Sequence, residues 1–136
     1  MDKLLQMMGL ARRANLLLAG EEAVADAIAA HKARLVLLAA DASERTGKKI
    51  RQMAGETLPV LVLPAEKDAL GAALGKGSCA VAAVLDGGFA AKLAQMLAQS
   101  NPDYVAVAER LNQKEAKRQR RKKEKPRIRK KSWDRG

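Results

Sequence analysis

Three continuous apolar runs, each of strand length, constrain the fold of this chain most strongly. They are RLVLLAA at residues 34–40, PVLVLP at residues 59–64 and CAVAAVL at residues 79–85. A strand with one face in water alternates apolar and polar residues, whereas a continuous apolar run indicates burial on both faces. We therefore expect these runs to be strands of a sheet that helices cover on both sides.

Helical patterns of about a dozen residues separate these runs. Glu21 and Glu22 lie in the first turn of one predicted helix, where the helix dipole favours acids, and His31 lies in its last turn. Ser43 is the expected N-cap of the next helix, and Asp86 begins a predicted turn. The predicted helices span residues 3–13, 21–32, 44–56, 65–75 and 89–99, with one more short strand at residues 16–19.

This alternation predicts an α/β fold, a three-layer α/β/α sandwich around a small mixed sheet. The chain has 136 residues, of which 48% are hydrophobic, so it can bury a real core. Because only Phe89, Tyr104 and Trp133 are aromatic, that core must be aliphatic.

The net charge of +11 is concentrated at the C-terminal end. Residues 1–100 hold 12 Lys and Arg against 10 Asp and Glu, whereas residues 101–136 hold 14 against 5. We therefore divide the chain into a near-neutral domain, residues 1–100, and a basic extension, residues 101–136. A cationic extension of this kind favours nucleic acid as a partner, although it can also serve only as a solvated tail.

The extension is expected to begin as a helix, with Asn101 as N-cap and Pro102 in the first turn. Val105, Ala108 and Leu111 have the spacing to dock that helix on the domain, and Val107 is a further candidate. No apolar stripe continues beyond residue 114, so we predict that Pro126 ends the helix and that disorder follows.

Residues with catalytic or metal-binding chemistry are scarce. His31 is the only histidine and Cys79 the only cysteine, so neither a zinc cluster nor an internal disulfide is expected. Residues 75–78 read GKGS, which lacks the full spacing of an ATP-binding loop but offers amides and one lysine to a phosphate. We predict that the protein is not an enzyme and uses no cofactor or small-molecule substrate. With neither a signal sequence nor a membrane span expected, we place it in the cytoplasm.

The order of several segments resembles a known family. The segments are MMGLARRANLLLAGEEAV, RLVLLAADASERTGKKI, LPVLVLP, ALGAALGKG and AVAAVLDGGFAAKL. Together they resemble the YlxQ-type bacterial branch of the kink-turn-binding ribosomal protein superfamily, over about residues 3–97. The resemblance implies the α/β/α sandwich and an RNA-binding surface made by three segments at one edge of the sheet. These segments correspond here to residues 20–26, 40–43 and 76–79.

The candidate RNA-binding residues come from these segments and from the basic extension. They are Gly20, Glu21, Glu22, Ala40, Asp41, Ser43, Lys76, Gly77 and Ser78 in the domain, and Arg118, Arg120, Arg121, Lys122 and Lys123 in the extension. Related proteins typically carry an amide or a cation where this chain has Glu22, and a cation where it has Asp26. Since acids repel phosphate, we expect kink-turn binding to be weakened and the extension to supply affinity.

These observations favour a ribosome-associated accessory protein, acting as a monomer, that binds structured RNA. Ribosomal RNA is the expected partner, and a kink-turn RNA is a possible one. Two other interpretations remain open. One is a module that docks on a ribosomal protein or a translation factor, and the other is a DNA-coating protein.

Overall fold

A computed structural model describes the backbone of residues 2–135 and the side chains of residues 3–121. Its centre is a four-stranded mixed sheet in the order β1-β4-β2-β3. β4 is antiparallel to both of its neighbours, and β2 and β3 are parallel. The strands are β1 (Leu17–Ala19), β2 (Leu35–Leu38), β3 (Val60–Val62) and β4 (Val81–Val84). The predicted small mixed sheet is therefore confirmed, with each strand shorter than its apolar run.

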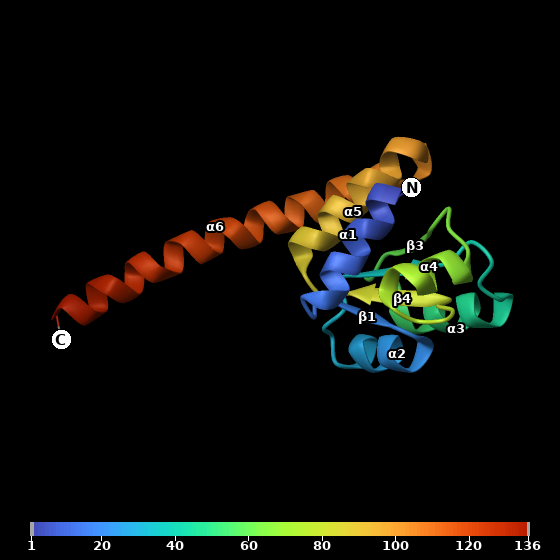
Figure 1. The fold of residues 1–136 in the computed structure, drawn as a ribbon. Coiled ribbons are helices and arrows are strands. Elements are labelled where there is room, and N and C mark those ends of the chain that lie inside the picture. Colours follow the sequence, from blue (N-terminus) through green and yellow to red (C-terminus); the bar gives the residue numbers. More distant parts are fainter. Residues whose placement is uncertain (1, 136) are drawn as a thin grey trace.

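Helices cover both faces of the sheet, as the continuous apolar runs predict (Figure 1). In β2, Leu35 and Leu37 face the larger core cluster, whereas Val36 and Leu38 face the smaller one. The larger cluster joins the sheet to α1 (Asp2–Arg13), α4 (Lys67–Leu74), α5 (Gly87–Ser100) and the start of α6 (Val105–Arg135). The smaller cluster joins it to α2 (Glu21–Ala29) and α3 (Glu44–Ala54). The three-layer sandwich is confirmed.

Side-chain caps fix where several helices begin. Ser43 caps α3 as predicted, because its hydroxyl accepts a hydrogen bond from the Thr46 amide at 3.1 Å. The predicted turn at Asp86 is wrong. Asp86 is instead the N-cap of α5, and its carboxylate accepts from the Phe89 amide at 2.9 Å. The sequence Asp-Gly-Gly resembles a turn, but here its two glycines form the first turn of the helix.

The start of the basic extension is tied to the sheet. Asn101 caps a short 3-10 helix, η1 (Pro102–Tyr104), which leads into α6. The Tyr104 hydroxyl accepts from the Val62 amide at 3.0 Å and donates to the Val62 carbonyl at 3.1 Å. Because β3 is an edge strand, Tyr104 satisfies backbone groups that would otherwise be free to pair with another chain.

The docking of α6 is confirmed at three of the four predicted positions, and Val107 is partly buried against the larger core cluster. Ala108 and Leu111 are buried in the larger core cluster, with 4% and 7% of their surface exposed. Val105, the first residue of α6, is 42% exposed, so its predicted docking is wrong. The packed part of the chain therefore extends at least to Leu111.

α6 is much longer than the sequence predicts. It continues to Arg135 and so passes Pro126, where we expected its end and the start of disorder. Proline removes one backbone hydrogen bond, whereas the Lys, Arg and Glu residues that dominate this stretch are good helix formers. Figure 1 shows α6 leaving the sandwich as a single projecting helix.

Candidate nucleic-acid interface

One edge of the sheet brings together the three segments that the sequence singles out. The Gly20 amide, just before α2, donates to the Val81 carbonyl at 3.0 Å. The Ala39 amide, just after β2, donates to the Ala80 carbonyl at 2.8 Å. Both hydrogen bonds end at the start of β4, so the loop before β4 lies between the other two segments. This edge consists of the start of α2, residues 39–43 and residues 75–80. We call it the loop edge.

Lys76 lies directly over Gly20. Its ammonium nitrogen is 3.3 Å from the point where a Cβ on residue 20 would lie. Gly20 also has φ 104° and ψ 148°, a backbone conformation that residues with side chains rarely adopt. Glycine is thus required at position 20 for its conformation, and it leaves the space that Lys76 occupies. The result is an exposed cation over the N-terminus of α2.

The first turn of α2 carries charges of both signs nearby. Gly20 provides no side-chain cap, so the amides there depend on backbone, water or a ligand for partners. Glu21 pairs with Lys49 of α3 at 3.5 Å, and both side chains are largely exposed. Glu22 and Asp26 are also exposed and lie one turn apart on α2. These two acids therefore reduce the positive potential that the dipole and Lys76 create.

Two predicted site residues hold the loop edge together. The Asp41 carboxylate accepts from the Lys67 amide at 2.7 Å and so caps α4, whose own N-cap residue, Glu66, makes no side-chain cap. The Ser43 hydroxyl caps α3 and donates to the Thr46 hydroxyl at 3.0 Å. Ala40 is exposed beside them. Asp41 and Ser43 thus shape this segment, and the sequence did not reveal the long-range cap.

The loop before β4 is anchored to α4 at both ends. Lys76 donates from its amide to the Gly71 carbonyl at 2.7 Å, and Cys79 donates to the Lys67 carbonyl at 3.0 Å. A Cβ on Gly71 would lie 2.7 Å from the Ser78 Cα, so the helix and the loop touch through backbone. Gly75 has φ 77° and ends α4 in the left-handed conformation.

Gly77, unlike Gly75, supplies no unusual backbone conformation to this loop. It has no positive φ, and no heavy atom lies within 4 Å of a Cβ built on it. The glycine that the loop requires is Gly71, a residue that the sequence analysis did not select. The one sequence signal for Gly71 is its position inside a predicted helix. Glycine destabilises a helix, so a glycine there indicates that another part of the chain packs closely against it.

The basic extension carries several cationic side chains on α6, beyond the last core residue, Leu111. The Arg118 guanidinium donates to both Glu115 carboxylate oxygens, at 2.7 Å and 3.1 Å. These hydrogen bonds and the charge of Glu115 raise the pKa of Arg118 above its ordinary value, with a smaller contribution from Asp86. Arg120 and Arg121 are exposed. The side chains of Lys122 and Lys123, which the sequence also selects, lie outside the described residues.

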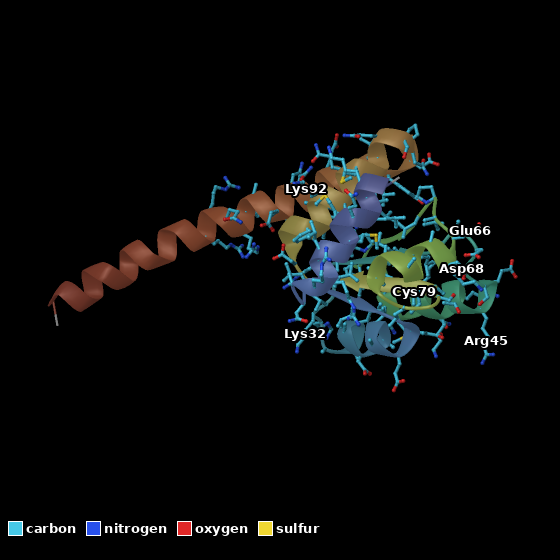
Figure 2. The ribbon with its side chains drawn as sticks, in the orientation of Figure 1. Lys32, Arg45, Glu66, Asp68, Cys79 and Lys92 are labelled. Carbon is cyan, nitrogen blue, oxygen red and sulfur yellow. The ribbon has the colours of Figure 1, made fainter. Side chains whose placement is uncertain are left out.

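Other chemistry is limited in the described part of the chain. No group of three or more His, Cys, Asp and Glu side chains there could hold a metal ion. Cys79 is a free, buried thiol inside the domain, whereas Glu66 and Asp68 at the start of α4 point outward (Figure 2). Among the described helices, none combines the length and apolar character that a membrane crossing requires.

Comparison with known proteins identifies relatives of the domain. Residues 2–94 match the model of the ribosomal protein L7Ae/L30e/S12e/Gadd45 family. The RNA-binding protein YlxQ of Bacillus subtilis is 37% identical over 91 residues, which cover 67% of this chain and 91% of that protein. A solved protein of unknown function from Bacillus halodurans is 41% identical, with a TM-score of 0.64, over 70% of this chain and 96% of that one.

A more distant structure shows the same fold. The 15.5kD RNA-binding protein of Giardia lamblia is 20% identical, with a TM-score of 0.57, over 68% of this chain and 82% of that one. The matches to the curated and solved relatives cover about two thirds of this chain.

Proposed function

Because this chain belongs to the ribosomal protein L7Ae/L30e/S12e/Gadd45 family, we propose that it is a non-enzymatic protein that binds structured RNA through the loop edge. The observation that carries the proposal is the position of Lys76, whose ammonium group lies over Gly20 at the N-terminus of α2. A cation and the free amides of a helix start together attract a phosphate. The name of the Bacillus subtilis relative, an RNA-binding protein, supports RNA as the ligand.

The exposed parts of the loop edge suit irregular RNA better than a regular duplex. Ala40 and Gly77 present small, exposed surfaces on either side of the edge, against which an unstacked base can pack. Proteins read sequence or shape in RNA mostly at such loops and bulges. We propose ribosomal RNA, with a kink-turn as one candidate element, bound by a monomer in the bacterial cytoplasm. The basic extension contributes affinity for phosphates along α6.

Replacing Lys76 by Ala should weaken binding of a structured RNA by about threefold to tenfold, as expected for one charge-assisted contact. Stability should change by less than about 0.5 kcal/mol, because the side chain is exposed. The measurement is an equilibrium titration with a kink-turn hairpin at about 0.15 M salt, where binding through the extension is weaker and masks the loss less than at low salt.

Lys92→Ala is the matched control, since Lys92 is an exposed lysine on α5 (Figure 2). It removes the same charge but lies outside the loop edge, so it should leave the affinity within about twofold of the native value. Equal losses in the two variants would remove Lys76 from the binding surface.

Replacing Glu22 by Asn and Asp26 by Lys should strengthen kink-turn binding about tenfold, because repulsion of phosphate is exchanged for attraction. The measurement is the dissociation constant for a kink-turn hairpin and for the same hairpin with its bulge paired. The gain should be larger for the kink-turn.

A matched variant makes the same charge change elsewhere. Glu109→Asn with Asp103→Lys alters two exposed acids near the start of α6. It tests for general electrostatic attraction, which should be similar for both hairpins. If the α2 variant gains no more than this control does, the start of α2 does not face the RNA.

A further inference from the structure

A cleft of about 420 Å³ lies where α6 leaves the sandwich. Its walls come from the ends of α2 and α3, the loop before β3, and one face of α6. Met53, Leu58, Pro59 and Leu111 supply apolar lining, and Met53 is 37% exposed. The volume is in the range of sites that bind one small organic group, such as a nucleotide.

The cleft is separate from the loop edge. Arg34, at its wall, precedes β2 and donates from its amide to the Val84 carbonyl at 2.7 Å. Ala39, on the loop edge, follows the same strand. Five residues of extended chain span about 16 Å, so the two sites lie at opposite ends of the sheet. One group cannot contact both.

Cations surround this apolar lining. Arg34, Lys114 and Arg118 line the cleft, against one carboxylate, Glu115. Glu115 accepts hydrogen bonds from Arg118 and from Gln119. Its Oε2 also lies 2.5 Å from where a Cβ on Gly87 would be, which places the carboxylate at the N-terminus of α5. The Asp86 carboxylate, at the N-cap of α5, lies beside that of Glu115, so two carboxylates offset two of the three cations and one positive charge remains to favour an anion.

The cationic wall continues along α6. Lys114, Lys117, Arg118 and Arg121 follow the spacing i, i+3, i+4 and i+7, which places them on one face of a helix. Lys114 and Arg118 line the cleft, and Lys117 and Arg121 are exposed beyond them. This basic stripe is about 10 Å long, and its N-terminal end lies in the cleft.

We propose that the cleft binds one unstacked nucleotide of single-stranded RNA, while the basic stripe of α6 holds the adjoining phosphates. This inference rests on the proposed RNA-binding function and adds a second RNA site to it. Arg34 and Lys114 contact the phosphate of the bound nucleotide, and the base packs on Met53 and Leu58. Arginine guanidinium planes are common platforms for unstacked bases. The protein then joins a structured RNA at the loop edge to a single strand at α6.

The test uses the full chain and a fluorescent, 4-thiouridine-containing uridine oligomer of about ten nucleotides, the length that single-strand sites commonly cover. Arg34→Gln with Lys114→Gln should weaken its binding about tenfold at about 0.15 M salt, because two phosphate contacts are lost. Lys3→Gln with Lys92→Gln, two exposed lysines on α1 and α5, removes the same charge and should change binding less than about twofold. Photocrosslinked peptides should include Met53 and Leu58.

The outcomes separate this inference from the loop-edge proposal. Lys76→Ala should weaken binding of the kink-turn hairpin and leave the oligomer unaffected, and the cleft variant should do the reverse. If the hairpin binds but the oligomer crosslinks only to residues 76–80 or beyond residue 120, the second site is wrong and the loop-edge proposal stands. If the cleft variant and its control lose the same affinity for the oligomer, the second site is also wrong. If neither RNA binds, both proposals are wrong.

Discussion

Removing residues 120–136 should weaken binding of structured RNA about a hundredfold at about 0.15 M salt. The deletion removes ten Lys and Arg residues against two Asp and Glu. If about five of these cations contact phosphates, the slope of log K against log salt becomes shallower by about 4. The measurement is a series of equilibrium titrations between low and physiological salt, for the full and the shortened chain.

The position of the deletion decides what the experiment measures. Ending the chain after Gln119 keeps Ala108 and Leu111 in the core and keeps the contacts of Glu115 with Arg118. Ending it after Ser100 would also remove Tyr104 from the edge of β3, so lost binding would be mixed with lost stability. A full-length chain with residues 120–136 in shuffled order keeps the charge and serves as the control. An unchanged salt slope after the deletion would contradict a phosphate-binding role for the extension.

Replacing Gly71 by Ala should destabilise the domain by about 1–3 kcal/mol, because the new Cβ meets backbone. That Cβ would lie 2.8 Å from the Ser78 nitrogen, so α4 and the loop that carries Lys76 must separate. RNA affinity should fall with stability, since Lys76 then leaves its position over Gly20. Thermal unfolding and RNA titration of the same variant give both values.

Gly77→Ala is the matched control in the same loop. A Cβ there meets no heavy atom within 4 Å, and the residue has no positive φ. It should fold with native stability, within about 0.5 kcal/mol, and so serves as the control for the thermal unfolding measurement. If Gly71→Ala is equally harmless, the close contact between α4 and the loop does not position Lys76.

The sheet and its layers are the part of the structure that local sequence predicts well. Each strand lies inside an apolar run such as RLVLLAA, because burial on both faces requires apolar residues at consecutive positions. Ser43 was recognisable as a cap, since it hydrogen-bonds only three residues away. The difference in charge between the domain and the extension can likewise be counted from the sequence without knowledge of any contact.

The features that were missed depend on residues far apart in the chain. Asp41 caps a helix that begins 26 residues later, and Tyr104 bonds to a strand 42 residues earlier. Position 71 requires glycine because the backbone of Ser78 lies against it, and only the folded loop brings Ser78 close. Arg118 was selected as a free cation, but Glu115, one turn earlier on α6, already binds it. Local sequence patterns therefore identified the segments of the site, but not the long-range hydrogen bonds and backbone contacts between them.

Crosslinking the protein to RNA in living bacterial cells, followed by sequencing of the bound RNA, tests the central claim most directly. We predict that crosslinks gather at discrete, structured positions in ribosomal RNA and that the Lys76→Ala variant loses part of them. RNA crosslinked to the Lys92→Ala variant, recovered in the same way, controls for the expression level and for the loss of one charge. Crosslinks that merely follow RNA abundance, or that do not exceed those of unirradiated cells, would contradict recognition of structured RNA by the loop edge.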